Sequence, residues 1–279
     1  MYEAYWQLDA RPFDHSADPR FYYPGESQQG ALLKLRYAVE MRQPAALLAG
    51  PAGVGKTALV QNLLRKCSEA LSPRLHIVYP QLPSDQLLSY LAAQLHPNAP
   101  RLEPRPEIRL DTPEQNLRQL ETVLGNNARA GKHALIIIDE AHLLANTGGL
   151  ETVRLLLNLQ CDGLPVATVL LLGQTGLLVA VERMPSLEER IAVKCLLRRL
   201  TQTETMAYVQ HRLQAAGAMR PLFTEAALEA VHQHSLGVPR RINRLCDLAL
   251  LVGFAEEASN IEASQVDAIS EELLTSSAE

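Results

Sequence analysis

The sequence has little cysteine, no long apolar run and no excess of positive charge. Its four cysteines are scattered along 279 residues without a C-x-x-C pair, so neither a zinc site nor a disulfide framework is predicted. The longest apolar runs are far too short to span a bilayer, and the first residues lack the basic and apolar regions of a signal peptide. These absences predict a cytoplasmic protein with no transmembrane segment.

The charge balance is slightly acidic. Lysine and arginine number 26 against 31 aspartates and glutamates, which gives a net charge of −5 and a pI near 5.9. A protein that coats nucleic acid is usually basic, so DNA is not a favoured partner, although a local basic surface could still bind it. Hydrophobic residues make up 47% of the chain, which is enough for a packed interior.

Three parts of the chain differ in their apolar patterns. Residues 1–26 are rich in aromatic residues and proline, and we expect them to be packed on the core rather than free. Residues 27–200 alternate strands and helices, which predicts an α/β domain with a central parallel five-stranded sheet flanked by helices. Residues 201–279 show helical patterns alone and predict a small all-helical domain. A proline-rich segment at 96–106 is expected to be a surface loop.

The individual elements are predicted from the apolar period and from flanking turn residues. The strand at Ala134–Ile138 is continuously apolar, as expected for a strand that is buried on both faces. In chain order the predictions are helix Ser27–Met41, strand Ala45–Ala49, helix Lys56–Leu71, strand Leu75–Tyr79, helices Ser84–Leu95 and Thr112–Ala130, strand Ala134–Ile138, helix Leu150–Cys161, strands Ala167–Leu172 and Val193–Leu197, and helices Thr203–Ala216, Thr224–Ser235, Pro239–Phe254 and Glu262–Leu274.

A phosphate-binding signature follows the first predicted strand. The run G-P-A-G-V-G-K-T fits the P-loop pattern G-x-x-x-x-G-K-[ST] and stands between a short apolar strand and a helix, as that motif requires. In such a loop the backbone N–H groups surround the phosphates of ATP, the lysine reaches the β- and γ-phosphates, and the threonine hydroxyl joins the Mg²⁺ shell. The predicted ATP-binding residues are Gly50, Pro51, Ala52, Gly53, Val54, Gly55, Lys56, Thr57 and Ala58.

Two adjacent acids end the apolar strand Ala134–Ile138. At the end of a central strand, Asp139 is suited to hold Mg²⁺ together with Thr57, directly or through water. Glu140 is suited to orient and polarise the attacking water. A water-activating carboxylate favours hydrolysis over transfer to a substrate hydroxyl. The pattern therefore predicts a Mg²⁺-dependent ATPase with ATP and Mg²⁺ as its ligands.

Three further polar residues are candidates for contacts with the nucleotide. Gln174 follows the next apolar strand, where its side chain could reach the γ-phosphate, although an ordinary turn residue fits the same place. Arg190 precedes the last predicted strand and could stabilise charge on the transferred phosphoryl group, although a solvated, salt-bridged arginine fits equally well. Arg240 lies near a helix N-terminus, which is unfavourable for a cation unless an anion is close by. His142, beside Glu140, is interpreted as a surface histidine.

The order of these parts resembles an AAA+ ATPase, and more narrowly the ExeA-like family of general secretion pathway and MSHA-type ATPases. Four segments carry the resemblance: Pro12-Phe13 with Asp18–Tyr22, Ile138–Leu144, Leu172–Gln174 and Gly237–Asp247. The resemblance implies that residues 27–200 are the AAA+ core and that residues 201–279 are its helical lid. It also implies that the lid and the end of segment 1–26 lie near the adenine.

The same resemblance assigns roles to the polar candidates. It implies that Gln174 is sensor 1, that Arg190 is a candidate arginine finger acting on a neighbouring subunit, and that Arg240 is the sensor-2 arginine of the lid. A homo-oligomer, either a ring or a filament, is therefore expected. In this sequence Thr175-Gly176 stand where the family usually has Pro-Glu.

Two functions fit this combination of motifs. In the first, an ExeA-like oligomeric motor or assembly factor acts on a protein client of a secretion, pilus or exopolysaccharide system, peripheral to the inner membrane through a partner. In the second, a DNA-associated ATPase regulator resembles the TnsC-type transposition proteins. The acidic pI favours the first function, and the lack of an envelope anchor favours the second. A monomeric ATP-dependent switch is a third reading, which would leave Arg190 without a role in a neighbouring subunit.

Overall fold

The computed structural model describes residues 1–14, 18–78, 80–95 and 112–275. The loop predicted at 96–106 and the last residue of the strand predicted at Leu75–Tyr79 lie outside these ranges. Contacts between Cα atoms divide the chain into two compact units, which we describe separately. Unit 1 consists of Met1–Gln29, Pro51–Asn62 and Arg198–Glu279, and unit 2 consists of Gly30–Gly50 and Leu63–Leu197.

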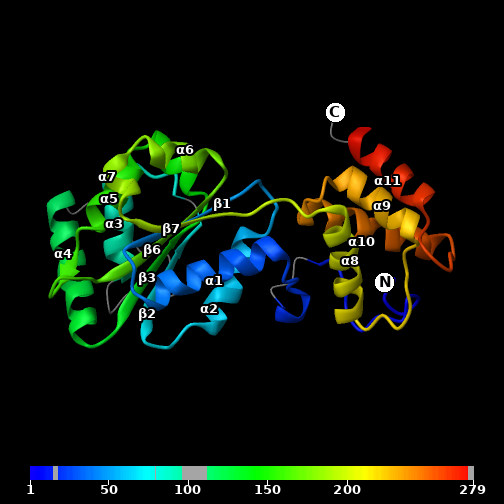
Figure 1. The fold of residues 1–279 in the computed structure, drawn as a ribbon, viewed down its shortest axis with the longest axis horizontal. Coiled ribbons are helices and arrows are strands. Elements are labelled where there is room, and N and C mark those ends of the chain that lie inside the picture. Colours follow the sequence, from blue (N-terminus) through cyan, green and yellow to red (C-terminus); the bar gives the residue numbers. More distant parts are fainter. Residues whose placement is uncertain (15–17, 79, 96–111, 276–279) are drawn as a thin grey trace. The chain divides into compact units, whose positions relative to one another are not determined.

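Unit 2 is built on a five-stranded parallel sheet, as predicted. The strands lie side by side in the order β2-β3-β6-β1-β7, and the helices of the unit flank them (Figure 1). Because the chain order differs from the spatial order, helical crossovers connect the strands, which is what parallel pairing requires. The strands are β1 (Ala45–Ala49), β2 (Leu71–Ile77), β3 (His133–Ile138), β6 (Ala167–Gly173) and β7 (Ile191–Leu196).

The helices of unit 2 cover both faces of the sheet. Alternate strand residues, among them Leu47, Ile136 and Leu171, form one core with the buried sides of α3 to α7. The opposite face packs on α1, where the Cys195 thiol of β7 approaches the carbonyl oxygen of Ala31. The helical elements are α1 (Glu26–Glu40) and α2 (Lys56–Lys66), each shared between the two units, then α3 (Ser84–Leu95), α4 (Pro113–Arg129), η2 (Ala141–Asn146), α5 (Gly149–Leu156), α6 (Gly176–Glu182) and α7 (Pro185–Glu188).

The helix that follows the P-loop is shorter than predicted. It ends at Lys66 rather than Leu71, and β2 begins at Leu71. The cause is Arg74, whose guanidinium donates hydrogen bonds to the carbonyl oxygens of Leu64 (3.0 Å), Ser68 (2.9 Å) and Leu71 (2.9 Å). Carbonyl groups at a helix C-terminus have no partner within the helix, and a cation that binds them stabilises the end of the helix.

A small hairpin replaces the end of another predicted helix. The helix predicted at Leu150–Cys161 stops at Leu156, and two short strands follow, β4 (Gln160–Cys161) and β5 (Leu164–Pro165). The turn between them is Asp162-Gly163, with φ values of +54° and +79°. Asp-Gly is a strong signal for a two-residue hairpin turn with positive φ at both positions. The apolar period of the preceding helix obscured that signal.

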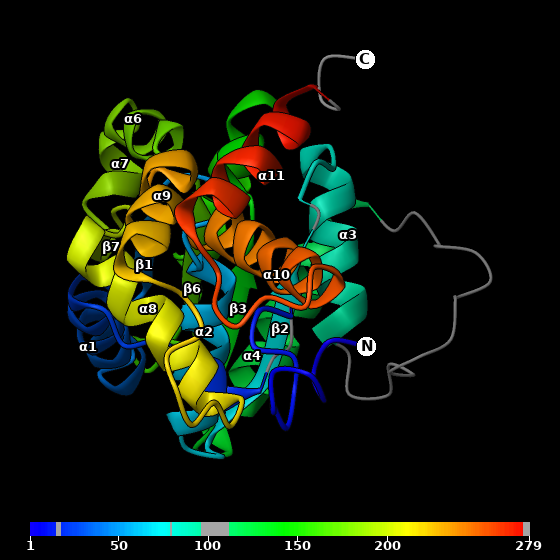
Figure 2. The ribbon, with the colours of Figure 1, turned by 90° about the vertical axis from the view of Figure 1, so that its right-hand side faces the viewer.

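The C-terminal part of unit 1 is all-helical, as predicted (Figure 2). Its helices are α8 (Gln202–Ala215), α9 (Glu225–Ser235), α10 (Pro239–Ala255) and α11 (Ala263–Thr275). A capping box between Thr201 and Glu204 starts α8, since each side chain bonds the backbone N–H of the other residue. The turn before α10 needs Gly237, because its φ is +68° and an added Cβ would lie 2.0 Å from the Leu200 carbonyl oxygen. In the described part of the chain, no helix has the length and apolarity needed to cross a membrane.

The N-terminal segment packs on these C-terminal helices. The indole N–H of Trp6 donates to the Leu250 carbonyl oxygen (2.9 Å), and the Tyr5 hydroxyl donates to that of Ala258 (2.7 Å). Arg212 of α8 donates to the Asp14 carbonyl oxygen (2.8 Å) and stacks over the Phe21 ring of the short helix η1 (Pro19–Phe21). Residues that are far apart in sequence thus build one apolar core. The predicted proximity of this segment to a nucleotide stays a prediction.

A buried histidine opens β3. The Thr168 hydroxyl donates its single proton to the Gln43 carbonyl oxygen (2.7 Å), so at the 2.8 Å contact between His133 Nε2 and Thr168 Oγ1 the imidazole must be the donor. Burial, and to a lesser extent the charge of Arg42, lowers the pKa of His133 to about 4. The imidazole is therefore neutral in the folded protein at neutral pH.

We expect this histidine to make folding pH-dependent. Because its pKa is lower in the folded state, the unfolded state takes up the proton first as the pH falls below 6.5. The free energy of unfolding should therefore be highest above pH 6.5 and decrease by up to about 3 kcal/mol between pH 6.5 and 4. Urea unfolding should be measured over this range for the wild type and for His133→Gln, which cannot titrate. The stability difference between the two should shrink with falling pH, and parallel curves would contradict this assignment.

Candidate functional site

The P-loop turn has the backbone conformation that its glycines suggest. Gly53 and Gly55 have φ values of +79° and +95°, which L side chains rarely adopt. Helix α2 begins directly after them at Lys56, so its first N–H groups have no partner within the helix. A loop with positive φ that leads into a helix N-terminus forms a concave anion site. The Lys56 ammonium donates a hydrogen bond to the Pro51 carbonyl oxygen (3.0 Å), which holds the lysine over its own loop.

Within unit 1, the first turn of α10 contacts the P-loop through the backbone. The Arg240 N–H donates to the Gly53 carbonyl oxygen (3.2 Å). A Cβ added to Gly53 would lie 3.0 Å from both Arg240 Cβ and Val238 Cγ1, so the close approach itself requires glycine. The sequence suggested a role for the Arg240 side chain near phosphate, whereas this main-chain link was not foreseen because no sequence pattern marks it.

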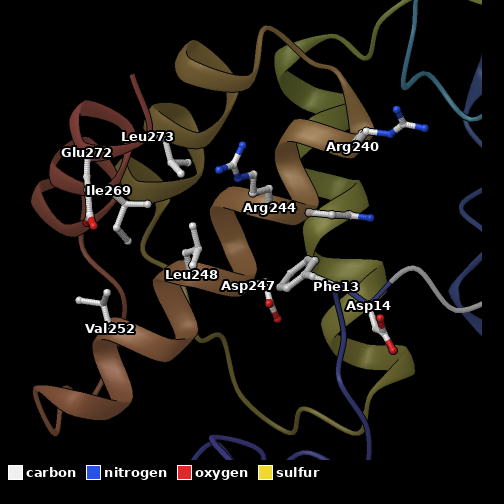
Figure 3. A pocket seen from close by; sticks show the side chains of 11 residues that line it. Phe13, Asp14, Arg240, Arg244, Asp247, Leu248, Val252, Ile269, Glu272 and Leu273 are labelled. Carbon is white, nitrogen blue, oxygen red and sulfur yellow. The ribbon is translucent and has the colours of Figure 1, made fainter. Parts of the chain in front are cut away.

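A pocket of about 530 Å³ runs along α10 in unit 1 (Figure 3). Arg240 and Arg244 lie at one end of its lining, and Leu248 continues the same helix face toward an apolar end. Asp247 and Glu272 also line the pocket, so its charge is mixed. The pocket therefore does not by itself favour an anionic ligand, and we assign none to it.

In unit 2, the predicted site residues meet at one edge of the sheet. Gly50, the first P-loop residue, donates its N–H to the Gly173 carbonyl oxygen at the end of β6 (3.1 Å). The strand β6 lies between β1 and β3, so Gly50, Gln174 and Asp139 all follow the carboxyl ends of adjacent parallel strands. Ligands of open α/β sheets bind at this edge.

The two acids differ in backbone conformation. Asp139 continues the sheet ladder, since its N–H donates to the Ile77 carbonyl oxygen (2.8 Å), and its Oδ1 accepts the Glu140 N–H (2.9 Å). Glu140 is left-handed, with φ +50° and ψ +34°, which is unusual for a residue with a side chain. The His76 Nε2 of β2 lies 3.8 Å from Asp139 Oδ2. The prediction did not include His76, because its strand has no motif.

A histidine that we interpreted as a surface residue lies among these groups. His142 Nδ1 is 3.4 Å from Glu140 Oε2 and accepts a hydrogen bond from the Gln174 N–H at 3.5 Å. The imidazole is 22% exposed, against 44% for the Glu140 side chain. The structure therefore brings His142 together with two predicted site residues. Its position two residues after Glu140 was the available signal.

The positions of Gln174 and Arg190 say less about their roles. Gln174 is exposed, as a residue that contacts a ligand or solvent would be. Arg190 is half-buried, and its guanidinium donates to the Leu157 carbonyl oxygen at the end of α5 (3.3 Å). To act on a neighbouring subunit, this side chain would have to leave that hydrogen bond.

Comparison with known proteins identifies the family. The family model described as "AAA ATPase domain" matches residues 26–171, slightly more than half of the chain. The protein is an AAA ATPase. It is also 32% identical over 268 residues to the "General secretion pathway protein A" of Aeromonas hydrophila. That match covers 94% of this ATPase and 46% of the relative, so the chain spans about half the length of the relative it matches.

Solved structures share the fold of this ATPase at lower identity. The ORC2 protein of Aeropyrum pernix, in ADPNP and ADP complexes, has a TM-score of 0.70 at 18% identity, covering 95% of this chain and 72% of that one. Drosophila ORC bound to DNA has a TM-score of 0.70 at 18% identity, covering 96% and 66%. The RuvB Holliday junction branch migration motor of Thermotoga maritima has a TM-score of 0.56 at 22% identity, covering 89% and 69%. These likenesses support the fold and no finer property.

The left-handed backbone of Glu140 leads to a prediction about stability. Replacing Glu140 by glycine or by alanine removes the same carboxylate, but only glycine adopts positive φ without strain. We expect Glu140→Gly to be more stable than Glu140→Ala by about 1 kcal/mol, measured by urea unfolding of the nucleotide-free protein. Equal stabilities, or a more stable alanine variant, would mean that the residue is not held in the left-handed region.

Proposed function

We propose that this AAA ATPase binds MgATP and hydrolyses it to ADP and phosphate. The observation that carries the proposal is the convergence of predicted residues at the carboxyl edge of β3, β6 and β1, where Asp139, Gln174 and Gly50 follow adjacent strands. The positive φ values of Gly53 and Gly55 and the start of α2 at Lys56 add a turn suited to phosphate.

The P-loop residues would bind the phosphates. The backbone N–H groups from Gly53 through Ala58 would donate to the phosphates, and the N-terminal dipole of the 11-residue helix α2 favours an anion there. Lys56 would exchange its hydrogen bond with the Pro51 carbonyl for the β- and γ-phosphates. The remaining loop residues in this role are Gly50, Pro51, Ala52, Val54 and Thr57.

The donor set fits Mg²⁺ better than a metal held by the protein alone. Among the described residues, no group of three or more histidines, cysteines or acids could hold a metal ion. Magnesium characteristically binds one or two protein oxygen ligands together with substrate phosphates and water, and Thr57 and Asp139 supply such oxygens. When bound, Mg²⁺ would neutralise charge on the β- and γ-phosphates.

The other site residues would act on the attacking water and on the developing charge. Glu140 would accept a hydrogen bond from the water and orient it, and Gln174 would contact the γ-phosphate. Arg240 would stabilise phosphate charge from the first turn of α10, whose N–H already binds Gly53 in the P-loop. Since Gln174 and Glu140 follow neighbouring strands, both can address the same reacting group.

The two chemical roles of Lys56 and Glu140 can be separated experimentally. We expect Lys56→Ala to weaken ATP binding by about 100-fold or more, because it removes a charged contact with phosphate. Glu140→Gln should keep the dissociation constant for ATP within about 3-fold but lower kcat by about 100-fold or more, since general-base catalysis is lost. Calorimetric ATP binding and phosphate release would measure the two effects.

Glu121→Gln, which alters an exposed acid on α4, is the matched control for the glutamate substitution and should change neither quantity. Wild-type turnover in Glu140→Gln would overturn the proposed mechanism.

We further propose that the working form is a homo-oligomer, a ring or filament, that acts on a protein client of a secretion, pilus or exopolysaccharide system. The relative named General secretion pathway protein A supports this direction. The half-buried Arg190, in the turn before β7, would complete the site of a neighbouring subunit.

The oligomer proposal predicts a concentration-dependent rate. ATP hydrolysis per subunit should increase with protein concentration, because isolated subunits lack the Arg190 of a neighbour. Arg190→Ala should lower the rate at high concentration by about 10³-fold, the lower end of the effect of an arginine finger. Arg183→Ala, which alters an exposed arginine nearby, should keep the wild-type profile. A flat rate that Arg190→Ala leaves unchanged would favour a self-contained switch.

The alternative of a DNA-associated regulator of TnsC type has no specific observation in its favour here. Drosophila ORC bound to DNA and the RuvB Holliday junction branch migration motor share 18% and 22% identity with this chain. Identity at this level supports the fold alone. The net charge of −5 also opposes a large DNA-binding surface. A salt-dependent stimulation of ATP hydrolysis by duplex DNA would reverse this preference.

A further inference from the structure

We propose that His142 is a positioning residue for hydrolysis, which couples the carboxylate of Glu140 to the end of β6 at Gln174. The inference rests on the proposed ATP hydrolysis through Glu140 and adds a residue to it. A single imidazole nitrogen, Nδ1, lies 3.4 Å from Glu140 Oε2 and accepts the Gln174 N–H at 3.5 Å. Both groups therefore address the same atom.

The backbone holds His142 in this position from two sides. On one side, the left-handed Glu140 turns the chain sharply out of β3 into η2, whose first residue, Ala141, is fully buried. On the other side, a Cβ added to Gly173 would lie 3.2 Å from the His142 backbone nitrogen, which is tighter than most real contacts. The end of β6 thus lies directly against the backbone of η2 at His142. Such packing pre-organises a side chain for its role.

The chemistry of one nitrogen makes its two contacts mutually exclusive. Neutral imidazole carries its proton on one ring nitrogen and accepts hydrogen bonds at the other. With the proton on Nε2, His142 Nδ1 accepts the Gln174 N–H, and Glu140 keeps its lone pairs for water. With the proton on Nδ1, His142 donates to Glu140 instead and loses Gln174. One acceptor site of the Glu140 carboxylate is then occupied by the imidazole rather than by water.

This exclusivity links the strand end to the general base. While Nδ1 accepts the hydrogen bond from the Gln174 N–H, it carries no proton and cannot donate a hydrogen bond to Glu140. A shift of Gln174 away from Nδ1, for instance when its side chain loses the γ-phosphate, allows the other tautomer and engages the carboxylate. His142 therefore makes the hydrogen bonding of the Glu140 carboxylate depend on the position of the β6 end. The Glu140 carboxylate would in this way respond to whether a γ-phosphate is bound.

Two substitutions separate this role from simple packing. His142→Phe keeps an aromatic ring of similar size but has no nitrogen. His142→Asn loses the ring. Its Oδ1, like Nδ1 of histidine, is two bonds from Cβ and can accept the Gln174 N–H. A packing role predicts that phenylalanine is tolerated and asparagine is not. The positioning role predicts the reverse order.

We expect His142→Phe to lower kcat for ATP hydrolysis by about 10-fold to 100-fold, while the dissociation constant for ATP changes by less than about 3-fold. His142→Asn should retain kcat within about 5-fold of the wild type, because one of the two contacts survives. Single-turnover phosphate release and equilibrium ATP binding would give the two quantities. Thermal unfolding of each variant would show that it is folded.

A matched control removes another histidine–carboxylate pair. His234 Nε2 lies 2.7 Å from Asp267 Oδ1 in unit 1, so His234→Phe makes the same chemical change outside the proposed site. Its kcat should equal that of the wild type. In a Glu140→Gln background, His142→Phe should lower the residual rate no further, since residues that act through one another are not additive.

The outcomes distinguish the inference from the function on which it rests. If the wild type releases no phosphate, or Glu140→Gln is fully active, the proposed hydrolysis mechanism itself fails. If Glu140→Gln is inactive while His142→Phe keeps the wild-type kcat, hydrolysis stands and the role of His142 is overturned. A greater loss in His142→Asn than in His142→Phe would likewise assign the residue to packing.

Discussion

The organisation of this protein depends on the parallel ladder formed by β3, β6 and β1. In that ladder Ile138 pairs with Leu171, and Ala49 pairs with Gly173, so the three strands end at the same edge. Because parallel strands run in one direction, the residue that follows each strand lies at that edge. Its position is set by the strand pairing and needs no contact between side chains. The strands β1 and β3 are buried on both faces, and a one-residue slip would exchange the side chains that pack on one face with those that pack on the other.

In each unit, unusual backbone conformations and close approaches occur where chemistry is expected. Glu140 is left-handed, and Gly173 admits the backbone of His142 where a side chain would collide. In unit 1, Gly53 combines positive φ with a close contact to the first turn of α10. Strained or sterically demanding backbone positions tend to gather at functional sites, where the surrounding structure holds them. Here they fix the backbone at Glu140, at Gly173 and at the P-loop turn.

Unit 1 shows how distant segments can form one core. The aromatic residues of the N-terminal segment bind α10 and its following turn through Trp6 and Tyr5. Pro51–Asn62, which contains most of the P-loop and the first part of α2, belongs to the same unit. The hydrogen bond from Arg240 N–H to the Gly53 carbonyl oxygen joins the loop to the C-terminal helices. If the loop changes conformation on binding phosphate, the first turn of α10 would move with it, because the two share a backbone hydrogen bond.

The sequence by itself determined the α/β class, the parallel sheet, the helical C-terminal region and the AAA ATPase family, because these follow from apolar period and from local motifs such as residues 50–57. It could not locate the end of α2, which Arg74 sets by binding carbonyl groups, and the helical period obscured the Asp162-Gly163 hairpin. Only the tertiary structure decided that His142 lies between Glu140 and Gln174 and that α10 binds Gly53. The contacts of His142 with Gln174 and of Arg240 with Gly53 join residues 32 or more positions apart, and no local pattern encodes the approach of one backbone to another.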